Sequence, residues 1–96
     1  MKVKLFIVYE DEVTDFPIKM VRQVKDVDDI ENKVIEFLKF NGLENRDGSI
    51  YDCCGVHKVN VTLGDIMSNL CTCSDPDHHI WVDEHWCLSV VETEVS

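Results

Sequence analysis

The sequence contains no long hydrophobic run, and it has no Lys or Arg after Lys58. A helix that crosses a bilayer needs roughly 18 to 20 consecutive apolar residues, and no stretch of this chain approaches that length. Met1 to Lys4 lead directly into a short strand-like run and show no signal-peptide cleavage pattern. We therefore expect a cytoplasmic protein without a transmembrane helix.

Positive charge is scarce in the whole chain, with 9 Lys and Arg against 19 Asp and Glu and a net charge of −10. Residues 1–58 carry a net charge of −3, whereas residues 59–96 carry −7 because seven acids there meet no Lys or Arg. A field of this sign repels the phosphates of nucleic acids and anionic lipid surfaces. We therefore expect neither nucleic acid nor a lipid surface as a direct partner. We expect the partner to be a protein with an electropositive surface.

The composition and the apolar periodicity predict a single α+β domain over residues 1–96. Residues 3–9 are apolar on both faces, which is typical of an interior strand. Residues 18–25 alternate, so that Ile18, Met20 and Val24 are expected on one face.

The clearest helix is predicted to begin at Asp28, with Glu31 completing a capping-box pattern. Ile30, Val34 and Phe37, with Leu38, form its buried stripe. Gly42 supplies the left-handed exit from the helix.

The second half of the chain predicts shorter elements. Residues 50–51 form a short extended piece, residues 56–63 alternate as a half-buried strand, and a short helix follows Thr62 and ends near Cys71. Residues 80–82 and 86–95 are expected to pair as a hairpin. The whole predicts a β-β-α-β-α-β-β order and a mainly antiparallel sheet of four to five strands, with one principal helix packed on it.

All five cysteines and all four histidines lie between Cys53 and Cys87. An odd number of cysteines fits a closed set of disulfides poorly, and cytosolic cysteines are more often thiols or metal ligands. A structural zinc site commonly takes two ligands from each of two turns. The predicted ligands are Cys54, His57, Cys71 and Cys73, and Cys53, His78 or His79 can replace one of them.

Two other interpretations of this region stay open. The cysteines can be small buried hydrophobes and the histidines surface residues. Alternatively, Asp75, Asp77, His78 and His79 are residue types of a hydrolytic metal centre, and Cys54 with His57 those of a nucleophile and its base. Because Asp-Pro-Asp is more often a turn, and a three-residue spacing rarely unites a nucleophile with its base, we expect no catalytic site.

The aromatic residues Tyr51, Trp81 and Trp86 also allow two interpretations. They can pack across a hairpin over the core, which is the more common role of strand aromatics. They can instead be exposed anchors of a protein interface.

Spaced carboxylates on a small protein present negative charge where the phosphates of a nucleic acid would lie. The candidate residues are Glu10, Asp11, Glu12 and Asp15 in the first loop, Asp26, Asp28 and Asp29 at the helix entry, and Asp75, Asp77, Asp83 and Glu84 in the second half.

In overall profile the chain resembles the small acidic phage-encoded inhibitors of bacterial defence, such as anti-CRISPR proteins and DNA mimics. The resemblance carries over no motif and no functional residue. It implies a non-enzymatic inhibitor that blocks a nucleic-acid-binding partner, for example a CRISPR-Cas effector, in a bacterial cytosol. The alternative function is a small zinc protein, either structural or hydrolytic.

Overall fold

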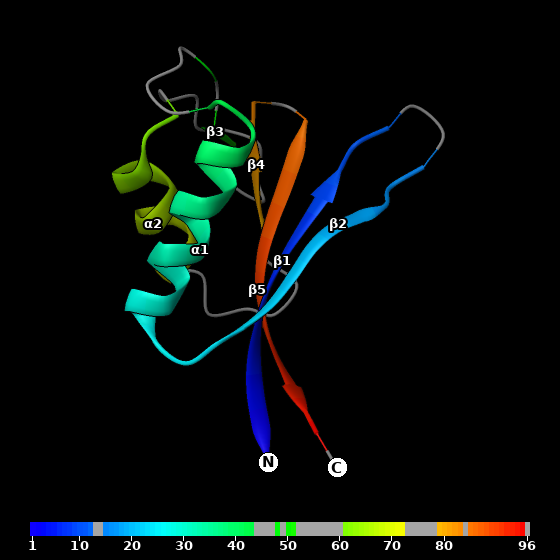
Figure 1. Cartoon of the computed structure of the whole chain (residues 1–96), viewed down its shortest axis with the longest axis vertical. Coiled ribbons are helices and arrows are strands. Elements are labelled where there is room, and N and C mark those ends of the chain that lie inside the picture. Colours follow the sequence, from blue (N-terminus) through cyan, green and yellow to red (C-terminus); the bar gives the residue numbers. More distant parts are fainter. Residues whose placement is uncertain are drawn as a thin grey trace.

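One antiparallel sheet of five strands organises the chain in a computed structural model (Figure 1). The structure describes residues 1–12, 15–43, 48, 50–51, 61–72, 79–83 and 85–95, with only the backbone of residues 71 and 72. The spatial order of the strands is β2-β1-β5-β4-β3. Their bounds are β1 Lys2–Glu10, β2 Ile18–Val24, β3 Ile50–Tyr51, β4 Ile80–Val82 and β5 Trp86–Glu94.

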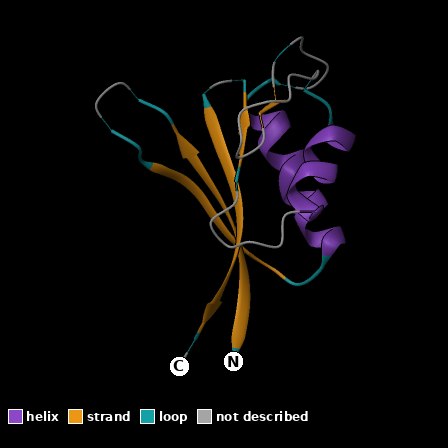
Figure 2. Ribbon diagram, turned by 180° about the vertical axis from the view of Figure 1, so that it is seen from behind, coloured by secondary structure: helices purple, strands orange, loops and turns teal. Residues whose placement is uncertain are grey.

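Two helices cover one face of this sheet (Figure 2). Helix α1 (Val27–Phe40) packs against helix α2 (Leu63–Thr72) and contacts β2, while α2 contacts β4 and β5. The predicted α+β class and antiparallel sheet are confirmed, but the expectation of one principal helix is not, because both helices contact the sheet. Neither described helix is long and apolar enough to cross a membrane.

Strand β1 lies inside the sheet, as its two-sided apolar pattern predicts. It pairs with β2 on one side and, over nine residues from Lys2↔Glu94 to Glu10↔Trp86, with β5 on the other. Phe6 and Val8 point toward the helices and are fully buried with Leu88 of β5. The predicted hairpin of β4 and β5 is also confirmed, with Ile80 opposite Leu88.

The alternation predicted for β2 is wrong at Ile18. Val8 pairs with Met20 but Tyr9 pairs with Ile18, so Lys19 is an extra residue in β2. Such a β-bulge shifts the phase of the strand, and the residues on its two sides no longer alternate in register. Met20 therefore packs against the core, whereas Ile18 shares the opposite face with Tyr9 and is 54% exposed.

The start predicted for the first helix is two residues late. Asp26 is the N-cap: its backbone is extended, and its carboxylate accepts a hydrogen bond from Asp29 N at 3.0 Å. The Asp29 carboxylate in turn accepts from Lys25 N at 2.9 Å. Asp28 lies inside the first turn, where its carboxylate still interacts favourably with the helix dipole. The predicted exit at Gly42 is confirmed by its φ of 63°.

The strand predicted over residues 56–63 is wrong at its described end, and residues 56–60 lie outside the described part of the chain. Val61 and Thr62 belong to no strand, and Leu63 begins α2. Thr62 caps this helix, since its Oγ1 accepts from Asp65 N at 3.2 Å and donates to Asp65 Oδ2 at 2.7 Å. This capping pair competes with extended structure and confirms the predicted helix start after Thr62.

The two aspartates at the start of α1 allow a direct test of the cap. Asp26→Ala removes the acceptor for Asp29 N and should lower the free energy of unfolding by about 1 kcal/mol. Asp28→Ala removes the same charge without a cap and should cost about half as much or less. Urea denaturation of both variants measures the difference; equal losses would contradict the assignment of Asp26 as the cap.

Candidate partner-binding surface

Two segments that are far apart in the sequence, the β1–β2 loop and the β4–β5 turn, meet at one end of the sheet. The β1–β2 loop and the β4–β5 turn both lie at the upper end in Figure 1. Asp11 N donates a hydrogen bond to His85 O at 2.8 Å, and His85 Nε2 lies 3.1 Å from Glu10 Oε1. We call this region the acidic end and define it by Glu10, Asp11, Glu12, Asp15 and Asp83.

The acidic end is only partly neutralised. Lys19 Nζ lies 3.4 Å from Glu12 Oε1 and 3.7 Å from Glu10 Oε2, so that one ammonium group serves two carboxylates. Asp11 and Asp15 are both exposed. Ion pairs between exposed groups are worth little in water, so an incoming cation can compete for these carboxylates. The acidic end therefore presents excess negative charge to solvent.

Two of these acids are held next to each other by backbone hydrogen bonds. Glu12 and Asp15 exchange backbone hydrogen bonds of 3.1 and 3.0 Å, and the Asp15 carboxylate accepts from Phe16 N at 2.9 Å. These hydrogen bonds restrict the positions of Glu12 and Asp15, which lowers the entropy that binding would otherwise cost.

The other predicted partner-contacting acids differ in their setting. Asp83 has a φ of 57° at the β4–β5 turn, and a Cβ placed on Gly48 would lie only 3.0 Å from its Oδ1. The Asp83 carboxylate thus lies close to the Gly48 backbone and is only half exposed. Asp75, Asp77 and Glu84 lie outside the described residues, so their role stays a prediction.

An aromatic row borders the acidic end on the sheet face opposite the helices. We define it as Tyr9, Phe16 and Trp81. The Phe16 ring stacks on Tyr9 with centroids 5.1 Å apart and planes at 7°, and it lies 5.6 Å from Trp81. Phe16 is 42% exposed. An exposed aromatic beside charged groups is typical of interface anchors.

The two tryptophans do not pack on each other across their hairpin. Trp81 pairs with Cys87, and Trp86 pairs with the buried Val82. Because successive residues of a strand point to opposite faces, Trp81 and Trp86 lie on opposite sides of the sheet. Trp86 meets the core through an edge-on contact with Phe37 at 5.6 Å, whereas Trp81 joins the aromatic row.

Cys87 lies between the two ends of the aromatic row. Its register partners are Tyr9 and Trp81, Phe16 contacts both of these rings, and Cys87 is only 3% exposed. Burial raises the pKa of the Cys87 thiol from 9.0 to about 11, against a smaller lowering by a hydrogen bond with Ser89. A thiol with this pKa stays protonated at neutral pH and is a poor nucleophile and metal ligand.

The predicted zinc ligands Cys54, His57 and Cys73 lie outside the described residues, as does the side chain of Cys71. Within the part of the chain that the structure describes, no three His, Cys, Asp or Glu side chains form a group that could hold a metal ion. Zinc binding therefore stays a prediction from the sequence.

The comparisons with known proteins found no relative of this chain. No protein-family model matches this chain, and neither a curated protein nor a solved structure shows significant similarity to it. Its function is therefore inferred from its own surface and chemistry.

Two residues of interest were missed by the sequence patterns. Phe16 belongs to none of the predicted elements or sites, although an aromatic residue next to an acidic loop is itself a signal of an interface. Phe40 follows Phe37 by three residues and lies at the margin of the α1 stripe, yet it is 86% exposed. The sequence signal that could have singled out Phe40 is its position beside the apolar stripe of the helix and next to the helix C-cap.

The burial of Cys87 predicts a pH dependence of stability. The native state holds the thiol proton more tightly than the unfolded chain, so this contribution is complete below about pH 9 and is lost as the pH rises toward 11. Urea midpoints measured over this range should fall more steeply for the wild-type protein than for Cys87→Ala. Parallel curves would contradict a raised pKa at Cys87.

The contacts of Phe16 predict that it shields Cys87. Phe16→Ala removes the ring that bridges Tyr9 and Trp81, and alkylation of native Cys87 by iodoacetamide should become about tenfold faster as the thiol gains access to water. Mass spectrometry of the peptide that contains Cys87 measures the rate separately from the other cysteines. Val21→Ala, an exposed residue of β2, is the control and should leave the rate unchanged.

Proposed function

We propose that this chain is a non-enzymatic binding protein that places its acidic end on a basic surface of a partner protein, of the kind that otherwise holds nucleic acid. The observation that carries the proposal is the junction of the β1–β2 loop with the β4–β5 turn through Asp11 and His85. This junction brings the turn that carries Asp83 next to the loop that carries the other four acids of the acidic end. Occupying the basic surface would inhibit the partner by steric and electrostatic blocking.

The charges of the acidic end support this function in two ways. Its exposed acids Asp11 and Asp15 each donate a backbone hydrogen bond, to His85 O and Glu12 O, and their carboxylates offer negative charge to Lys and Arg side chains of a groove. The net charge of −10 adds a long-range field that steers a basic protein toward the chain and repels nucleic acid. A CRISPR-Cas effector or another nucleic-acid-binding defence protein fits this chemistry.

The aromatic row supports the choice of a protein rather than a small cation as the partner. The exposed Phe16 stacks on Tyr9, and its backbone N donates to the carboxylate of the preceding Asp15, so apolar and acidic contacts lie side by side. Protein interfaces combine aromatic anchors that exclude water with a polar rim. A free inorganic cation would use only the carboxylates.

Charge reversal tests the proposal. The double variant Asp11→Lys/Asp15→Lys changes the acidic end, and Glu92→Lys/Glu94→Lys makes the same change of net charge near the other end of β5, where both acids are exposed. Tagged protein is used to capture partners from a bacterial lysate. A partner should be retained by the wild type and the β5 variant and lost with the acidic-end variant.

The salt dependence of capture is the second part of this test. Because the Debye length falls from about 10 Å at 0.1 M to about 3 Å at 1 M ionic strength, retention should weaken steeply over that range. The eluted partner should bind DNA or RNA, and added wild-type chain should compete with that binding. Retention that is indifferent to salt and to Asp11→Lys/Asp15→Lys would overturn the proposed function.

A further inference from the structure

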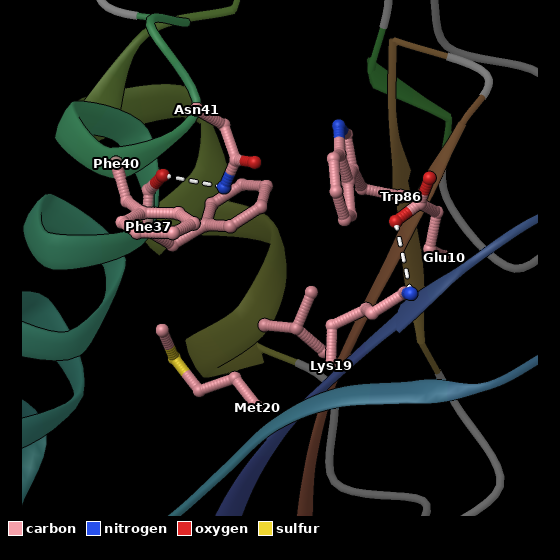
Figure 3. A pocket seen from close by; sticks show the side chains of 8 residues that line it. Glu10, Lys19, Met20, Phe37, Phe40, Asn41 and Trp86 are labelled. Atoms are coloured by element: carbon pink, nitrogen blue, oxygen red, sulfur yellow. Dashed lines mark hydrogen bonds and ion pairs between the residues drawn. The ribbon is translucent and has the colours of Figure 1, made fainter.

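A half-open cavity of about 220 Å³ lies between the sheet and the C-terminal end of α1, next to the acidic end (Figure 3). Its lining is mostly apolar and includes three aromatic rings. An engineered apolar cavity of roughly 150 Å³ is large enough to hold benzene, so this one can accept a leucine or phenylalanine side chain. The lining residues are Val8, Glu10, Lys19, Met20, Phe37, Phe40, Asn41 and Trp86.

The β-bulge in β2 builds one wall of this cavity. In a regular strand Lys19 and Met20 would point to opposite faces. The extra residue in β2 lets both side chains line the cavity, and Figure 3 shows Met20 below Phe37 while Lys19 extends toward Glu10. Bulges recur near binding sites because they redirect a side chain in this way.

Phe40 forms part of the opposite wall. It is 86% exposed, the largest exposed fraction among the large apolar side chains of the described residues. The end of α1 is held in place beside it, since Asn41 N and Nδ2 both donate to Phe37 O, at 3.1 and 2.9 Å. An exposed aromatic ring on a fixed helix end gains free energy when another apolar group covers it.

The charges at the mouth of the cavity favour a ligand in which positively charged groups flank the apolar group. Glu10 lines the cavity, and Glu12 lies beside it through their shared contact with Lys19. The two carboxylates outnumber the one ammonium group, and the exposed Asp11 lies between them in the chain. A ligand that carries positive charge next to its apolar part is therefore complementary, and an acidic ligand is repelled.

We infer that the cavity receives an apolar side chain, such as leucine, from a segment of the partner protein in which Lys or Arg residues flank that side chain. The inference rests on the proposed function for the basic character of the partner, and it adds a hydrophobic anchor to it. The apolar side chain fills the space between Phe40, Met20 and Trp86. The flanking cations contact Glu12 and Asp11.

Three synthetic peptides test this inference with the intact chain. The first has a central leucine flanked by arginines, the second has serine in place of the leucine, and the third keeps the leucine but replaces the arginines by glutamines. Binding is followed by NMR of protein carrying ¹³C-labelled methionine methyl groups. Met20 lines the cavity, while Met1 is at the chain end and Met67 packs in α2, so these two are internal controls.

The leucine–arginine peptide should shift the Met20 methyl signal, leave those of Met1 and Met67 in place, and bind about tenfold more tightly than the serine peptide, since burying a leucine side chain contributes at least that factor. Phe40→Ala should remove most of this advantage without changing affinity for the serine peptide. Val27→Ala, an apolar position 56% exposed at the other end of α1, should leave the advantage intact.

The outcomes separate this inference from the proposed function. Equal, salt-sensitive binding of the leucine and serine peptides without a Met20 shift would overturn the anchor and leave the acidic-end function standing. Equal binding of the two leucine peptides, with the Met20 shift, would support the cavity as an apolar site and overturn the electrostatic function. An advantage of leucine that survives Phe40→Ala unchanged would overturn the placement in this cavity.

Discussion

The pairing of β1 with β5 is the interaction on which the rest of this structure depends. The two strands run antiparallel in continuous register from Lys2↔Glu94 to Glu10↔Trp86, and each carries a further hairpin partner. This pairing sets which side chains face the helices, so that Phe6 and Val8 enter the core. It also places the end of the β1–β2 hairpin beside the β4–β5 turn, which creates the acidic end.

Near the acidic end, one extra residue in β2 determines which side chains of this strand lie on each face of the sheet. The bulge at Lys19 places Met20 and Lys19 at the cavity and leaves Ile18 on the other face with Tyr9. The same hairpin thus supplies a wall of the cavity and, through Tyr9 and Phe16, most of the aromatic row. Both apolar features adjoin the acidic end because they arise from one hairpin.

The proposed interface joins two interactions with different ranges. Carboxylates at the acidic end act over a Debye length and speed encounter with a basic partner, but each exposed ion pair adds little affinity. Burial of Phe40 and the cavity acts only at contact, yet it does not weaken with salt in the same way. Charge then selects and orients the partner, and apolar contact slows its release.

Elements with local patterns follow from the amino-acid sequence alone. The apolar run of β1, the stripe of Ile30, Val34 and Phe37, and the left-handed exit at Gly42 all follow from neighbouring residues, because helix and strand periodicity are properties of short segments. The start of α1 does not follow from the pattern alone, since Asp26 and Asp28 both precede the same stripe and only the geometry of the cap distinguishes them.

Contacts between distant groups depend on how the whole chain packs. No local pattern reveals that Asp11 contacts His85, that Lys19 interrupts the alternation of β2, or that Phe40 and Trp86 line the same cavity. These contacts depend on strand order and register, which are determined by the burial of the whole sheet against both helices. The physical reason is that side-chain periodicity specifies a face for each segment, whereas the packing of segments specifies what that face touches.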